Sequence, residues 1–80
     1  MNLSTLKSYI KMGREIEFSY DGVMYSITYT FDDNKQTISF CRFDYSCTDY
    51  STMEEFLASA KVEEEYLRDI LENIEAITVY

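Results

Sequence analysis

The cysteine, serine and carboxylate side chains are the residues of this chain whose chemistry could support catalysis or metal binding. Cys41 and Cys47 are candidate nucleophiles or zinc ligands, and the 15 acidic residues are candidate general acids and bases. The chain has no histidine, so the cysteines and serines lack the base that usually activates them. A zinc site would have to use thiols and carboxylates alone, without a Cys-x-x-Cys pair. We therefore expect no metal and no cofactor.

The placement of the acids and glycines also argues against an enzyme. A catalytic carboxylate pair needs two acids in unlike environments within a cleft, whereas these acids fall on predicted helix exteriors and turn tips. Gly13 and Gly22 stand alone, at a predicted helix end and in a predicted turn, so they do not build a phosphate-binding loop. The sequence predicts a non-enzymatic binding protein.

The net charge of −8 comes entirely from the C-terminal half of the chain. Residues 1–43 contain five acids and five bases, whereas residues 44–80 contain ten acids and two bases. Proteins use lysine and arginine to neutralise the phosphates of nucleic acids and of anionic membranes. The charge balance therefore argues against direct nucleic-acid or membrane binding and favours a basic protein partner.

The termini and the two cysteines favour a cytoplasmic protein. The N-terminal residues lack the apolar core of a signal peptide, and no run approaches the roughly 20 apolar residues of a membrane span. Thiols stay reduced in the cytoplasm. We therefore expect Cys41 and Cys47 to be free thiols rather than a disulfide.

Hydrophobic periodicity predicts one α+β domain over residues 1–80. Apolar residues at helical spacing predict a first helix over residues 4–12, capped by Ser4 and ended by Gly13. From residue 14 the apolar residues alternate, and Asp21-Gly22 is a strong signal for a hairpin turn. A two-residue turn pairs residue 20 with 23, 18 with 25 and 16 with 27, which places the apolar residues of both strands on one face.

A third strand, over residues 36–45, completes a predicted three-stranded antiparallel meander. Pairing residue 31 with 36 continues the apolar face of the hairpin. Arg42 and Asp44 then fall on the core face, while Cys41, Phe43 and Tyr45 fall on the other. Either a β-bulge near residues 40–42 restores the alternation, or the second face of the sheet carries an apolar patch.

The rest of the chain is predicted to form two helices that pack on one face of the sheet. Residues 46–50 are predicted to be a polar connection, and Ser51 with Glu54 matches a capping box for a helix ending near Ala60. The second helix has one apolar stripe, formed by Tyr66, Leu67, Ile70, Leu71 and Ile74. Residues 77–80 fit a short fourth strand at a sheet edge. The polar serine and threonine face of the sheet stays open.

Two surfaces are candidate binding sites. The first is the acidic face of the last helix, formed by Glu64, Glu65, Asp69, Glu72 and Glu75. Acids one helical turn apart are separated by about 5–6 Å of rise, which is comparable with phosphate spacing, although such a face is also the ordinary solvated side of a helix. The second is a cluster on the open sheet face, formed by Met24, Cys41, Phe43 and Tyr45. If exposed it would bind a protein, and if covered it would be a small satellite core.

The chain resembles small acidic anti-CRISPR proteins of phages, which inhibit type II RNA-guided nucleases by mimicking nucleic acid. The resemblance is carried by Met1-Asn2, Leu6 and Ile10-Lys11, by the order of a sheet and then two helices, by length and by acidity. In those inhibitors the acids lie largely on strands and loops, whereas here most fall on the last two predicted helices, so no residue role is carried over.

The chain is equally similar to small uncharacterised proteins of Gram-positive bacteria and their mobile elements. The anti-CRISPR resemblance implies an inhibitor that docks into a basic groove of a nucleic-acid-binding protein. The alternative is a structural or self-associating domain, monomeric or homodimeric, that uses the open sheet face.

Overall fold

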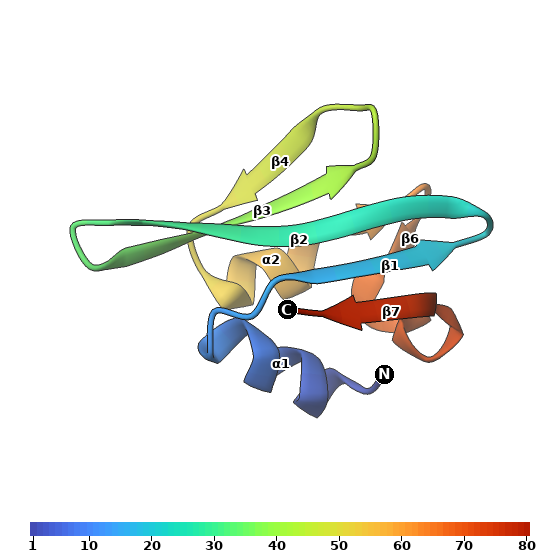
Figure 1. Ribbon diagram of the computed structural model, residues 1–80, viewed down its shortest axis with the longest axis horizontal. Helices are drawn as coiled ribbons and strands as arrows, with labels where there is room; N and C mark the ends of the chain where they lie inside the picture. The colour runs from blue at the N-terminus through green and yellow to red at the C-terminus, as the bar shows by residue number, and fades with distance from the viewer.

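A five-stranded antiparallel sheet lies over a layer of helices in the computed structural model, which describes residues 1–80 (Figure 1). The strand order is β4-β3-β2-β1-β7, so the last strand of the chain pairs with the first. Figure 1 shows α1 and α2 on the same side of the sheet, while the other face carries no helix. The elements are α1 (Leu3–Lys11), β1 (Ile16–Tyr20), β2 (Val23–Asp32), β3 (Lys35–Arg42), β4 (Cys47–Tyr50), α2 (Met53–Ser59), β5 (Lys61–Val62), β6 (Glu65–Tyr66), α3 (Leu67–Ile70), the 3-10 turn η1 (Leu71–Asn73) and β7 (Glu75–Val79).

The first helix begins one residue earlier than its predicted start. Its N-cap is Asn2, whose side chain accepts a hydrogen bond from the backbone N–H of Thr5 at 2.8 Å. The predicted cap, Ser4, already lies inside the helix. Asn2 takes the capping role because its extended backbone lets its side chain accept from an N–H group of the first helical turn. Gly13 follows the helix with φ of +69°, as its predicted place beyond the helix end requires.

The hairpin of β1 and β2 has the predicted register. Asp21 and Gly22 both have positive φ, 53° and 79°, which is the geometry of the expected two-residue turn. The paired residues are Ile16 with Ile27, Phe18 with Tyr25, and Tyr20 with Val23. The cross-strand match of apolar residues was therefore sufficient to fix this register.

The third strand, β3, is shorter than predicted and contains no bulge. Its pairing with β2 runs without a shift from Asp32 opposite Lys35 to Tyr25 opposite Arg42. The strand ends at Arg42 rather than at residue 45, because Asp44 adopts φ of 68° in the turn that follows. Arg42 needs no bulge to escape the core, since it lies at the end of the strand and is exposed.

Residues 47–50, predicted to be a polar connection, form the edge strand β4. Cys47 lies directly opposite Cys41 on β3, and the two side chains form a disulfide. The expectation of two free thiols is therefore wrong for this structure. The hairpin that brings these cysteines into register depends on the buried ring of Tyr50, which packs on Phe56 of α2 with 5.5 Å between ring centres.

The predicted long C-terminal helix is replaced by a small hairpin, two short helical turns and a strand. Strands β5 and β6 pair around a tight turn in which Glu63 has φ of 59°. The backbone N–H of Leu67 then bonds to the carbonyl of Ala60 at 2.9 Å, which closes the hairpin onto the end of α2. Of the predicted apolar stripe, the residues at 67, 70, 71 and 74 are buried, whereas Tyr66 is only half-buried.

Two further boundaries differ from the predicted ones. Helix α2 is capped by Thr52, whose hydroxyl accepts from the N–H of Glu55 at 3.0 Å, and not by Ser51. Strand β7 pairs with β1 at the sheet edge, as expected, but starts at Glu75 rather than near residue 77. Its register shifts between residues 17 and 19 of β1, where Ala76 adopts φ of 51°. An extra residue in β7 therefore forms a bulge.

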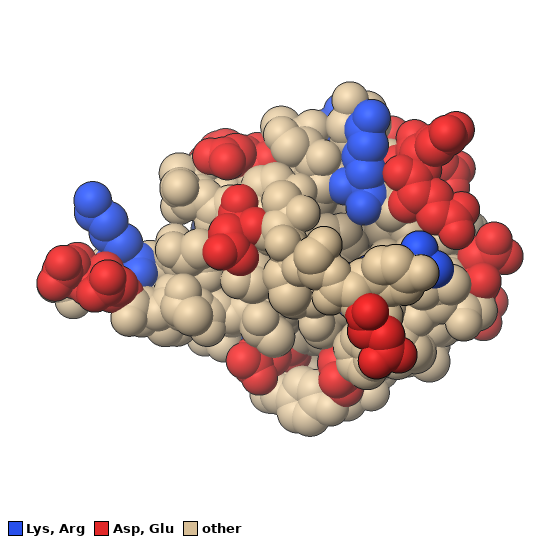
Figure 2. All heavy atoms as spheres, turned by 90° about the horizontal axis from the view of Figure 1, so that it is seen from above, with Lys and Arg blue, Asp and Glu red and all other residues tan.

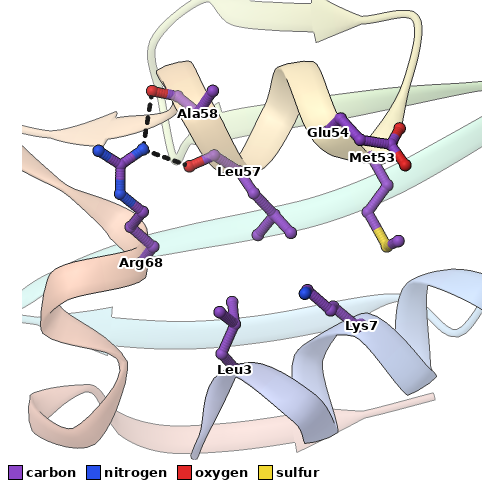
Figure 3. A pocket seen from close by; sticks show the side chains of 7 residues that line it. All are labelled: Leu3, Lys7, Met53, Glu54, Leu57, Ala58 and Arg68. Carbon is purple, nitrogen blue, oxygen red and sulfur yellow. Dashed lines mark hydrogen bonds between the residues drawn. The ribbon is translucent and has the colours of Figure 1, made fainter.

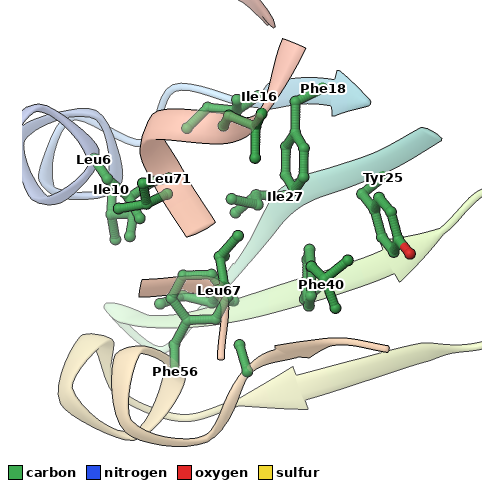
Figure 4. Packing of buried hydrophobic residues seen from close by; sticks show 14 of the residues in the cluster. Leu6, Ile10, Ile16, Phe18, Tyr25, Ile27, Phe40, Phe56, Leu67 and Leu71 are labelled. Atoms are coloured by element: carbon green, nitrogen blue, oxygen red, sulfur yellow. The ribbon is translucent and has the colours of Figure 1, made fainter. Parts of the chain in front are cut away.

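The core lies between the sheet and the helical layer and contains no buried polar or charged residue. Figure 4 shows side chains of the sheet meeting those of α1, α2 and the C-terminal turns. Phe40 packs edge-on against Phe56 at 5.9 Å between ring centres, and Phe18 stacks on Tyr25 at 5.5 Å. The first contact joins β3 to α2, and the second joins β1 to β2. None of the helices has the length and the apolar character that crossing a membrane requires.

Candidate functional site

The acidic residues predicted to share one helix face lie on separate segments. Glu64 and Glu65 belong to the β5–β6 hairpin, Asp69 and Glu72 to α3 and η1, and Glu75 to the start of β7. All five are exposed. The prediction of a single acidic helix face is therefore wrong. Residues 61–66 form a hairpin, and the helical part that follows is too short to carry a row of acids.

Two turns nevertheless gather carboxylates around the hydroxyl of Tyr20. This hydroxyl donates a hydrogen bond of 2.7 Å to Oε2 of Glu65, which joins the end of β1 to β6. The hydrogen bond, desolvation and the negative charges of Glu65, Asp21 and Glu63 all raise the pKa of Tyr20. The hydroxyl therefore remains a donor at neutral pH and holds the Glu65 carboxylate in place. Together with Glu64, these three acids form the acidic end of the molecule.

Figure 2 shows the charged side chains of the molecule in a view from above relative to Figure 1. Acidic side chains gather densely at one end in this view, a smaller acidic group with one cation lies at the other end, and single acids and cations lie between them. On β2 and β3, serine and threonine residues alternate with the core residues, so these strands add few charges to the face of the sheet opposite the core.

Two cations that were not predicted from the sequence lie beside the acidic end. Arg42 and Lys61 line a small pocket of about 180 Å³ together with Glu63. The Arg42 guanidinium lies 4.5 Å from the ring centre of Tyr45, and the Lys61 ammonium lies 4.9 Å from that of Tyr66. These contacts depend on the turn after β3 and on the β5–β6 hairpin, neither of which was predicted.

The apolar cluster predicted on the open sheet face is partly present. Met24 and Cys41 are half-buried, and Phe43 is 42% exposed. The N–H of Phe43 bonds to the carbonyl of Met24 at 3.0 Å, so these two residues are neighbours as expected. Tyr45 stacks on Arg42, and Arg42 ends β3 opposite the core residue Tyr25. Tyr45 therefore does not complete the cluster. Met24, Phe43 and the disulfide form the sheet patch. The C-terminal strand does not cover it, because β7 lies beside β1.

A groove between α1 and α2 is the largest hollow of the molecule and was not anticipated from the sequence. It has a volume of about 320 Å³. Figure 3 shows Leu3 and Leu57 from the two helices pointing into it, with Arg68 of α3 at one end. Leu3 is 38% exposed and Leu57 is only half-buried. Both line the groove.

The other perturbed tyrosines hold their protons more tightly than usual. Burial and then the charge of Glu15 raise the pKa of Tyr29 to about 12, and its hydroxyl donates to the carbonyl of Arg14 at 2.8 Å. A hydrogen bond to Glu17 raises the pKa of Tyr80. Neither hydroxyl can act as a base at neutral pH. No group of three or more cysteine, aspartate or glutamate side chains is placed to hold a metal ion.

No protein-family model, no curated protein and no solved structure matches this chain. The acidic end, the sheet patch and the groove are therefore the features from which its function can be inferred.

Proposed function

We propose that this chain is a non-enzymatic binding protein whose acidic end docks into a basic groove of a nucleic-acid-binding protein. In this role it would act as an inhibitor that mimics nucleic acid, for example of an RNA-guided nuclease. The observation that carries the proposal is the set of carboxylates held around Tyr20 at the tips of two hairpins. A chain of net charge −8 adds long-range attraction to any basic groove.

The geometry of the acidic end suits docking because its carboxylates project from short turns. Asp21 and Glu63 adopt φ of 53° and 59°, so each side chain leaves a tightly bent backbone. The hydrogen bond from Tyr20 to Glu65 links the two hairpins. Charges that are already positioned lose less conformational entropy on binding than charges on flexible segments.

The test begins with capture of partners from a lysate of a Gram-positive bacterium. A captured protein supports the proposal only if it binds nucleic acid and if this chain displaces labelled nucleic acid from it. Displacement should be strong at about 50 mM salt and much weaker at about 300 mM, because exposed charges are screened within less than ~10 Å there.

A pair of charge-matched variants locates the docking surface. Glu63→Lys/Glu64→Lys changes the charge of the acidic end by +4, and Asp32→Lys/Asp33→Lys makes the same change in the β2–β3 turn. All four residues are exposed, and each pair contains one residue with positive φ. We expect the first variant to lose displacement and the second to retain it. Equal loss in both, or salt-insensitive binding, would contradict docking through the acidic end.

The sheet patch supports a second candidate function, self-association or protein binding through the open face. Phe43 is 42% exposed beside Met24, although large apolar side chains are usually withdrawn from water. This reading predicts binding that strengthens or stays constant as salt rises, because apolar burial does not depend on charge.

A further inference from the structure

The groove between α1 and α2 has the size and lining of a small-molecule site. Its volume of about 320 Å³ lies at the lower end of the range of roughly 300–1,000 Å³ that ligand pockets occupy. Its apolar lining comes from Leu3, Met53, Leu57 and Ala58. Such pockets are usually apolar with a few polar groups that orient the ligand. Here those groups are Lys7, Glu54 and Arg68.

The apolar lining consists of side chains from facing helices. Figure 3 shows Leu3 of α1 and Leu57 of α2 directed toward each other across the groove, with Met53 farther along α2. Leu3 is 38% exposed, and Leu57 and Met53 are half-buried. A ligand with an apolar body would remove these three side chains from water, which is favourable in proportion to the area buried.

One of the two cations of the groove is held rigidly. Nη1 of Arg68 donates to the carbonyls of Leu57 and Ala58, both at 3.0 Å, and thereby binds the last turn of α2. The guanidinium also lies 4.3 Å from the ring centre of Tyr66. These contacts fix the position of a charge that retains further N–H donors.

The other cation has no partner among the groove residues. Figure 3 shows the Lys7 ammonium pointing into the groove, and the hydrogen bonds drawn there come from Arg68 alone. Lys7 is half-buried and lines the groove together with Leu3, Met53 and Leu57. An unpaired cation beside apolar side chains is suited to an anion that carries an apolar body.

The charges of the groove also define the charge of its ligand. Lys7 and Arg68 contribute +2 and Glu54 contributes −1, so the lining sums to +1. A monoanion neutralises this charge. A dianion would leave excess negative charge beside Glu54, in a chain that already carries −8.

We propose that the groove binds a small amphiphilic monocarboxylate, such as a medium-chain fatty acid. Its carboxylate lies by Lys7, its alkyl chain covers Leu3, Met53 and Leu57, and Arg68 adds positive charge at the end of the groove beside Ala58. The proposal is independent of docking through the acidic end, because the two surfaces share no residue.

The experiment titrates the full chain with decanoate and follows backbone amide shifts by NMR. We expect saturable shifts in α1, α2 and around Arg68. Decanol and decyltrimethylammonium, which carry the same chain on a neutral or a cationic head, should bind at least tenfold more weakly. The dianion decanedioate should also bind more weakly. Equal binding of decanol, or no shifts in α1 and α2, would overturn the proposal.

The matched variants are Lys7→Met and Lys11→Met, both on α1. Lys7 lines the groove and Lys11 does not, while both substitutions keep an apolar stem and raise the net negative charge by one. We expect Lys7→Met to weaken decanoate binding about tenfold or more and Lys11→Met to leave it nearly unchanged. Thermal unfolding confirms that both variants fold. Equal affinity of the two folded variants would overturn the role of Lys7 and with it the proposed site.

Discussion

Six residues other than glycine adopt positive φ, and all six occupy turns or a bulge. Four are aspartate or asparagine, whose short polar side chains tolerate this conformation best. Glu63 and Ala76 are the exceptions. Both occupy conformations that their side chains disfavour by about 1 kcal/mol, so the surrounding pairing must hold them there.

Ala76→Gly should therefore stabilise the protein. Glycine adopts positive φ without a steric cost, so we expect the free energy of unfolding to rise by up to about 1 kcal/mol. The control is Ala58→Gly, in the exposed part of α2, which should lower the free energy of unfolding by about 1 kcal/mol. Urea unfolding of both variants measures the two effects. Destabilisation of similar size in both would show that residue 76 does not adopt positive φ in solution.

Among the elements, β4 is the one whose presence depends most on a single covalent bond. It is four residues long, lies at the sheet edge and places only Tyr50 in the core. Apart from its backbone pairing with β3, it is attached by the disulfide from Cys47 to Cys41 and by a hydrogen bond of 2.6 Å between Ser39 and Asp49. Such a short edge strand needs these cross-strand attachments.

Removing the disulfide should lower stability without changing the central strands. The bond joins residues six apart, and closing so short a loop is worth about 2 kcal/mol. We expect Cys41→Ser/Cys47→Ser to lose about this amount in urea unfolding. Reductant should produce the same loss in the wild type and none in the double variant. Two titratable thiols in the untreated native protein, with stability indifferent to reductant, would show that the disulfide does not form.

The success of the sequence predictions differs between elements for a physical reason. The β1–β2 hairpin was predictable because Asp21-Gly22 specifies the turn and a one-residue slip would misplace every apolar side chain. The region after α2 was not, because a long helix and a hairpin followed by short turns bury the same apolar residues. Two hydrogen bonds favour the hairpin, namely Leu67 to Ala60 within this region and the long-range bond of Tyr20 to Glu65.

The candidate sites were predictable only in part for the same reason. The exposed acids and the neighbours Met24 and Phe43 follow from pattern and register. The gathering of Asp21 with Glu63 depends on two hairpins that are remote in sequence. The groove depends on how α1 packs beside α2, and no local pattern encodes this packing.

For the molecule as a whole, net charge acts in opposite directions on the two candidate functions. A second copy of this chain also carries −8, so self-association through the sheet patch works against charge repulsion at low salt. Docking of the acidic end to a basic partner has the opposite dependence, since attraction is strongest at low salt. Ionic strength therefore separates the two functions without knowledge of the partner.

Sedimentation of the isolated protein applies this difference. We expect the wild type to sediment as a monomer at both about 50 and about 300 mM salt. The proposed function uses the acidic end, which does not require the sheet patch to self-associate. Phe43→Asp should also be a folded monomer with a loss below about 1.5 kcal/mol, since a side chain that is 42% exposed contributes only part of its full burial energy. A wild-type dimer that forms as salt rises and is abolished by Phe43→Asp would instead assign self-association to the sheet patch. Unfolding of Phe43→Asp in a monomeric background would place Phe43 in the core, leaving the acidic end and the groove as the surfaces available for binding.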